Sequence, residues 1–147
     1  MNAPHFAMKH TLLLAALLAS TGHAFAEDDD AFFAPSPYVQ AISAFEKNDI
    51  ATAEKLVTPL VADPASATAD ALALLGRIRL SQKRSDEAVA SLARAVALKP
   101  DHASFLTFLG LALLDQANAS EGPARTELAT QSFSRLTRAA ELAPTNA

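Results

Sequence analysis

Apolar and small residues in the middle of the chain recur at intervals of three, four and seven positions, which places them on one side of an α-helix. This spacing predicts a first helix over residues 67–82 and a second over residues 86–98, joined by the polar turn Lys83-Arg84-Ser85 and ended by Pro100. Stretches rich in Val, Ile, Thr and aromatic residues, which would indicate strands, are missing from the sequence. The inward positions expected in these two helices are Leu72, Leu75, Gly76, Leu80, Ala88, Leu92 and Ala95.

The same helical hairpin recurs further along the chain. Leu106-x-x-Leu109-Gly110 repeats Leu72-x-x-Leu75-Gly76 at an offset of 34 residues, whereas Ala139-x-x-Leu142-x-Pro144 repeats Ala95-x-x-Leu98-x-Pro100 at an offset of 44. About ten residues are therefore inserted, and we expect them around residues 117–128, with a lengthened last helix that begins near Pro123. The inward side of this last helix is expected to carry Leu128, Phe133, Leu136, Ala139 and Ala140.

An earlier and looser unit precedes these two. Its expected turn is Asn48-Asp49, and Ser36 before Pro37 is a good helix start because Ser caps free backbone N–H groups. The unit lacks the Gly of the later units and counts as one residue short, and Pro59 should bend or end its second helix. Its expected helical positions are Tyr38, Ala41, Ile42, Phe45, Ala53, Leu56, Val57 and Leu60.

A 34-residue period of helix–turn–helix units resembles the tetratricopeptide repeat family. The matching residues are Leu72, Leu75, Gly76, Ala88, Leu92, Ala95 and Pro100, then Leu106, Leu109, Gly110, Leu136, Ala139 and Pro144. Arg79 and Leu113 stand where the family has an aromatic residue. The resemblance implies an all-α, α-α superhelix, a short solenoid of three hairpins over residues 37–147 with units of about 37–64, 67–100 and 103–144. The competing fold is an ordinary helical bundle.

The resemblance also implies that the first helices line a concave groove for a partner peptide. We expect an extended or helical apolar segment there, with Arg77 meeting a carboxylate. The alternative is that the apolar residues are core, covered by the last helix or by a second copy of the chain. The groove residues implied are Ala73, Leu74, Arg77, Leu80, Thr107, Phe108, Leu111 and Leu114.

Residues 1–26 have the layout of a cleaved signal peptide. Lys9 provides a positive start, residues 11–20 form an apolar run too short to span a membrane, and an Ala-x-Ala pattern ends at Ala26. We expect a secreted protein, periplasmic if its source is a diderm bacterium, with no membrane span after cleavage. Translation from Met8 instead of Met1 would give a more compact signal. Residues 27–36 are expected to form an acidic linker that contains Pro35.

Composition limits the chemistry. The 147 residues include no cysteine, and His102 is the one histidine after residue 26, so we predict no catalytic residues, no metal site and no cofactor. Apart from Glu27-Asp28-Asp29-Asp30, residues 27–147 carry 12 acidic and 11 basic side chains, and this near-neutral body argues against nucleic acid as a partner. A basic cluster, Arg77, Arg79, Lys83 and Arg84, either interacts with a helix terminus or binds an anionic partner.

These observations predict a non-catalytic protein–protein interaction module, a scaffold or chaperone whose partner is a protein or peptide. The alternative function is a self-associating structural protein, a homo-oligomer that binds no foreign peptide.

Overall fold

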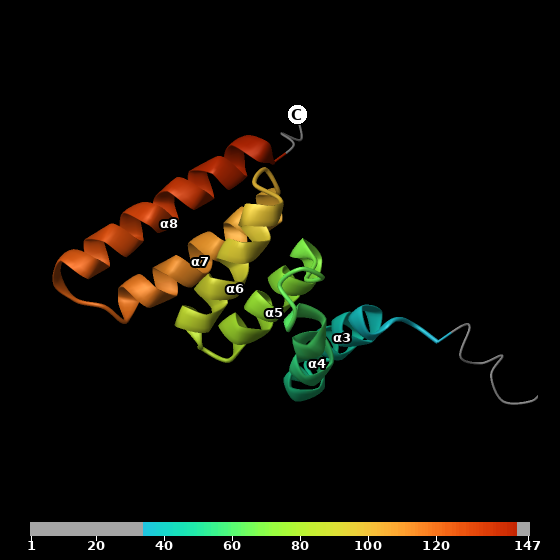
Figure 1. The fold of residues 1–147 in the computed structure, drawn as a ribbon. Helices are drawn as coiled ribbons and strands as arrows, with labels where there is room; N and C mark the ends of the chain where they lie inside the picture. The colour runs from blue at the N-terminus through green and yellow to red at the C-terminus, as the bar shows by residue number, and fades with distance from the viewer. Residues whose placement is uncertain (1–33, 144–147) are drawn as a thin grey trace, which may run out of the picture. The chain divides into compact units, whose positions relative to one another are not determined.

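The computed structural model describes residues 34–143, and within this range the chain is helical without a strand (Figure 1). Its six α-helices and one 3-10 turn follow one another with short connections. The elements are α3 (Pro37–Glu46), α4 (Ile50–Val57), η1 (Thr58–Val61), α5 (Ala69–Ser81), α6 (Ser85–Leu98), α7 (Ala103–Asn118) and α8 (Gly122–Leu142).

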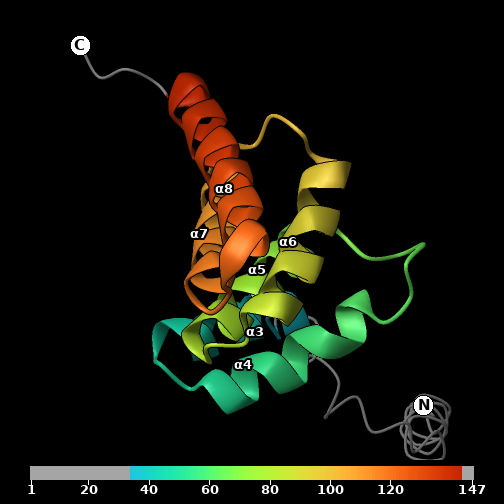
Figure 2. The ribbon, with the colours of Figure 1, turned by 90° about the vertical axis from the view of Figure 1, so that its left-hand side faces the viewer.

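The helices form three consecutive hairpins, α3/α4, α5/α6 and α7/α8, which stack in chain order. The second helix of one hairpin packs against the first helix of the next, so α4 contacts α5 and α6 contacts α7. The first helices also contact one another, α3 with α5 and α5 with α7. Figures 1 and 2 show the hairpins side by side along one direction. Contacts restricted to neighbouring hairpins are typical of a solenoid, which confirms the superhelix and excludes the ordinary bundle.

Polar side chains cap the first turns of α3, α4 and α5. The hydroxyl of Ser36 accepts a hydrogen bond from the N–H of Val39 at 3.4 Å, and Pro37 occupies the first turn, as the sequence predicted. Thr68 and Asp49 cap α5 and α4 in the same way, with bonds of 3.2 Å. Each cap satisfies a backbone N–H that has no partner within the helix, and such caps typically stabilise a helix by about 1 kcal/mol.

The turns fix the register of the first hairpin. Asn48 and Lys83 occupy the left-handed region with φ values of 60° and 62°, at matching points of the first two turns. Positions 48 and 83 differ by 35, which sets the offset between the first two hairpins. With this offset Ala41 corresponds to Gly76 and Ala53 to Ala88. Ala41 is fully buried, so a small residue occupies the packing point even where glycine is absent.

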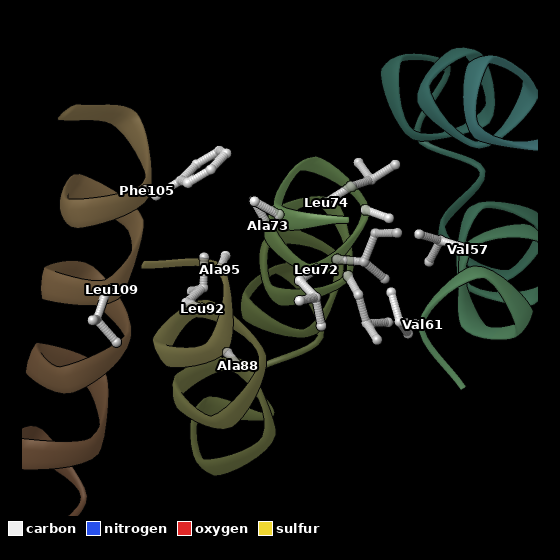
Figure 3. Packing of buried hydrophobic residues seen from close by; sticks show 14 of the residues in the cluster. Val57, Val61, Leu72, Ala73, Leu74, Ala88, Leu92, Ala95, Phe105 and Leu109 are labelled. Carbon is white, nitrogen blue, oxygen red and sulfur yellow. The ribbon is translucent and has the colours of Figure 1, made fainter. Parts of the chain in front are cut away.

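Close packing explains the two glycines inside helices. A Cβ atom on Gly76 would overlap Cγ of Leu92, and one on Gly110 would lie 2.7 Å from Cγ of Leu136. The two glycines therefore allow α6 and α8 to approach their hairpin partners α5 and α7. Figure 3 shows the core that results, with Leu92 and Ala95 of α6 lying between Leu72 of α5 and Leu109 of α7.

The third hairpin is longer than the second in both of its helices. α7 has 16 residues where α5 has 13, and α8 has 21 where α6 has 14. These differences of three and seven account for the ten extra residues, so the inserted segment extends the helices and does not form a separate loop. α8 begins at Gly122, next to the expected Pro123.

Two further expectations, one about the end of a helix and one about the inward face of a helix, have different outcomes. Pro59 does end the second helix of the first hairpin early, because α4 stops at Val57 and the chain continues as η1. The inward positions predicted for Phe133 and Ala140 were wrong, since the Phe133 side chain is 73% exposed and Ala140 is exposed as well. Ser132 takes the inward position, and its hydroxyl donates to the carbonyl of Gly110 at 2.7 Å. One residue further along a helix is a rotation of about 100°, which turns Phe133 away from α7.

Candidate peptide-binding surface

The first helices of the three hairpins together line a hollow of about 220 Å³. No residue of the second helices α4, α6 and α8 contributes to this lining. The surface therefore depends on the stacking of all three hairpins, because each of them supplies only part of the wall. The lining residues are Tyr38 and Ile42 of α3, Asp70, Ala73, Leu74 and Arg77 of α5, Ser104, Phe105 and Phe108 of α7, and His102 just before α7.

Arg77 is held between two aromatic rings in this hollow. Its guanidinium carbon lies 5.0 Å from the ring centre of Phe45 and 4.8 Å from that of Phe108. A cation over an aromatic face is stabilised by about 0.5–1 kcal/mol at an exposed site. The ion pairs formed among residues 34–143 do not include Arg77. Its position is thus fixed by rings from α3 and α7, and its charge has no carboxylate partner in that range.

Polar and aromatic groups form the opposite edge of the hollow. Lys99 Nζ donates to the carboxylate of Asp70 at 2.8 Å and lies 5.9 Å from the ring centre of Phe105. His102, the residue that precedes α7, stacks on Phe105 with ring centres 3.8 Å apart. Burial and, second, the charge of Asp70 raise the pKa of the Tyr38 hydroxyl. This edge combines a paired charge with a flat aromatic surface.

The hollow includes half of the residues implied for a groove. Ala73, Leu74, Arg77 and Phe108 line it, and Ala73 and Leu74 do so as largely buried side chains that form its floor. Figure 3 shows Ala73 and Leu74 on α5 with Phe105 facing them from α7.

The other four residues lie outside this hollow. Leu80 is half-buried against the core, and the hydroxyl of Thr107 donates to the carbonyl of Ala103. Leu111 and Leu114 of α7 are 42% and 39% exposed.

Sequence reasoning missed the contribution of the first hairpin. Under the offset of 35, Tyr38 corresponds to Ala73 and Ile42 to Arg77, so extending the register of the second unit would have found both. The sequence alone did not reveal this register, because the first unit lacks the glycine that marks it in the second and third units. His102 occupies the position just before α7, and its part in the aromatic edge had no sequence signal.

The basic cluster is largely used in packing between helices. Arg84 bonds to Glu54 of α4 at 2.7 Å and to Glu87 of α6 at 2.6 Å, so it links the first two hairpins. These bonds raise the pKa of Arg84, the one to Glu87 most strongly. Arg79 donates to the hydroxyl of Ser91 at 2.6 Å, which explains a polar residue at a position the family fills with an aromatic ring. Arg77 alone among the four lines the hollow.

Two other features are absent from the described part of the chain, a metal-binding cluster and a membrane-spanning helix. Residues 34–143 contain no cluster of three His, Asp or Glu side chains arranged to hold a metal ion. None of the helices in that range is both long and apolar enough to span a membrane.

Comparison with known proteins identifies the repeat. Residues 38–103 and, overlapping them, residues 82–144 match the family model described as tetratricopeptide repeat. The two matches together cover most of the chain and all three hairpins. No curated protein matches the sequence.

Proposed function

The chain belongs to the tetratricopeptide repeat family, and from this membership we propose a non-catalytic scaffold or chaperone that binds a partner segment on the surface formed by α3, α5 and α7. Repeats of this family generally mediate protein–protein interaction and are typically non-catalytic. The observation that carries the proposal is Arg77, held between Phe45 and Phe108 in the hollow without a carboxylate partner among residues 34–143.

The chemistry of the hollow selects the kind of segment that fits. A carboxylate, from an acidic side chain or a free C-terminus, pairs with Arg77 through charge-assisted hydrogen bonds. An apolar side chain next to it fills the space in front of Tyr38 and Phe105. Because two rings already hold the guanidinium, little further side-chain entropy is lost when the carboxylate binds.

The surface is long enough for several residues of the partner. Leu111 and Leu114 are exposed on α7, three and six residues after Phe108. They offer further apolar contacts in the direction away from His102. The proposed ligand is therefore an acidic-apolar peptide of several residues, extended or helical, with its carboxylate anchored at Arg77.

A displayed library of random peptides tests this proposal. We expect the parent chain to enrich peptides in which a carboxylate adjoins an apolar or aromatic residue, and Arg77→Gln to lose that enrichment while remaining folded. Arg94→Gln is the matched control, because Arg94 is an exposed arginine of α6 and lies outside the hollow. Equal enrichment with the parent and with Arg77→Gln would refute the proposed anchor.

We further propose that the module acts outside the cytoplasm, in the periplasm if the source is a diderm bacterium. The support is the signal-like segment at residues 1–26, which lies outside the described residues. N-terminal sequencing of the protein recovered from its native source is expected to begin at Glu27. A protein that keeps residues 8–26 would contradict export with cleavage.

A further inference from the structure

Glu54 of α4 connects the first hairpin to the second through both of its carboxylate oxygens. Oε1 accepts a hydrogen bond from Nη1 of Arg84 at 2.7 Å, and Oε2 accepts one from the side-chain amide of Gln82 at 2.7 Å. Among residues 34–143, no other side chain of the first hairpin forms a hydrogen bond or an ion pair with the second. The polar contact between these two hairpins therefore depends on one residue.

The remaining contact between the two hairpins is largely apolar. Ala53, Val57 and Val61 are buried in the core that they share with Leu72 of α5, and Figure 3 shows the two valines beside α5. Hydrophobic attraction is non-directional, so it holds the hairpins together without fixing their relative rotation. Hydrogen bonds weaken steeply when their angles change. The bonds to Glu54 therefore fix the orientation of the first hairpin on α5.

A tight turn connects the position of Glu54 to that of Phe45. The N–H of Asn48 donates to the carbonyl of Phe45 at 3.0 Å, and the N–H of Asp49 donates to the carbonyl of Ala44 at 2.8 Å. These bonds hold the end of α3 against the start of α4. A displacement of α4 at Glu54 is therefore passed on to the ring of Phe45.

The second hairpin has a matching turn. The N–H of Arg84 donates to the carbonyl of Arg79 at 2.9 Å, which is the same bond 35 residues further along the chain. It attaches Arg84 to the end of α5. Arg77 lies on the same helix, about one turn before its last residue. The two partners of Glu54 are therefore held at a fixed place relative to Arg77.

We propose that Glu54 is a positioning residue of the peptide-binding surface, which orients the first hairpin so that the ring of Phe45 meets the guanidinium of Arg77. This inference rests on the proposed function of that surface. The contacts form a closed path, from Arg77 along α5 to Arg84, across to Glu54, and through the first turn to Phe45. The path closes where the ring centre of Phe45 lies 5.0 Å from the guanidinium carbon of Arg77.

The same kind of bond recurs at the next junction between hairpins. Gln116 of α7, 34 residues after Gln82, donates its side-chain amide to the carboxylate of Asp86 at 2.9 Å. In both cases an amide near the end of a first helix reaches an acidic side chain on the second helix of the preceding hairpin. This recurrence indicates that the bond at Glu54 belongs to the stacking of the repeat.

The side-chain signal of Arg77 tests the positioning without any peptide. Aromatic rings displace the magnetic resonance signals of nuclei over their faces, so the Nε–Hε signal of Arg77 reports on both rings. The rings of Phe45 and Phe108 lie at 5.0 and 4.8 Å, so Phe45→Leu and Phe108→Leu should each remove a comparable part of the displacement. We expect Glu54→Ala to remove the part that Phe45→Leu removes. Glu54→Gln keeps one acceptor oxygen and should give a smaller change in the same direction.

Glu87→Ala is the matched control for these variants. Glu87 is the other carboxylate partner of Arg84, at 2.6 Å, but it lies on α6 within the same hairpin. Its removal takes a bond of the same kind from Arg84 without releasing the first hairpin, so the Arg77 signal should stay as in the parent. An Arg77 signal unchanged in both Glu54 variants, or changed equally by Glu87→Ala, would overturn the proposal.

Peptide affinity tests the functional consequence separately. The probe is a synthetic peptide in which glutamate and phenylalanine residues alternate. We expect Glu54→Ala to bind it at least about threefold more weakly than the parent, the loss expected when the surface is assembled in a third of the molecules. Glu87→Ala should bind as the parent does, and equal affinity of Glu54→Ala and the parent would overturn the proposal. If the parent binds no such peptide, the proposed function fails, and the Arg77 signal alone decides whether Glu54 positions Phe45.

Discussion

Replacing Gly76 by alanine tests whether close approach of α5 and α6 requires glycine. An added Cβ would overlap Cγ of Leu92 and lie 3.0 Å from both of its Cδ atoms. Carbon atoms pack favourably at about 3.5–4.0 Å, so the leucine has to move. Leu92 is fully buried and therefore has little space to move into.

Two opposing terms set the magnitude of the Gly76→Ala effect. Alanine is favoured over glycine inside a helix by about 1 kcal/mol, whereas overpacking of a buried site costs about 1–3 kcal/mol and occasionally more. Because the overlap involves the branching carbon of Leu92 and not a mobile chain end, the packing term dominates. We expect a net loss of about 1–2 kcal/mol in the free energy of unfolding.

Chemical denaturation followed by circular dichroism measures this loss, and two companion variants interpret it. Gly122→Ala is a control without contacts, because no atom lies within 4 Å of an added Cβ and only the φ of 59° is unfavourable. In a Leu92→Ala background the obstruction is gone, so Gly76→Ala should become neutral or stabilising. A Gly76→Ala protein as stable as the parent would refute the close-approach explanation.

The remaining predictions concern burial and charge. Leu109→Asp should unfold the chain, because it places an unpaired charge at a 4% exposed core position, whereas Leu111→Asp, on the exposed side of the same helix, should change stability by less than about 0.5 kcal/mol. Thermal melts of both variants check this, and similar melting temperatures would contradict it. The hydrogen bond from Gln82 and the bond to Arg84 lower the pKa of Glu54. Glu54→Gln should therefore cost about 1 kcal/mol at neutral pH, and the difference from the parent should vanish as the pH falls through that lowered pKa. Denaturation at several pH values checks this, and a difference that persists at low pH would contradict it.

Much of the fold follows from local features of the sequence. The helical spacing around Leu72 and Leu106 locates the two complete hairpins, and Pro59 marks the early end of α4. These signals are readable because they depend on periodicity and backbone chemistry within a few residues. The inward residue of α8 could not be found this way, because Ser132 and Phe133 are neighbours. Hydrophobicity alone favours the phenylalanine, whereas the bond from Ser132 to the Gly110 carbonyl decides the rotation.

The candidate site was only partly predictable for a similar reason. Arg77 and Phe108 stood out through the repeat register, but the ring of Phe45 on the other side of Arg77 comes from another hairpin. Such a contact depends on how hairpins stack. The basic cluster illustrates the same limit, because Arg84 bonds to Glu54, 30 residues away. Sequence distance gives no indication of such pairing until the register of both hairpins is fixed.

The most direct test of peptide binding at Arg77 is a nuclear magnetic resonance titration of the isotope-labelled chain with a peptide selected by display. We predict that the shifted signals cluster at Tyr38, Arg77, Phe105 and Phe108, and that Arg77→Gln abolishes them. Shifts confined to α8, or unchanged binding by Arg77→Gln, would contradict the proposal that the partner binds on the first helices of the repeats.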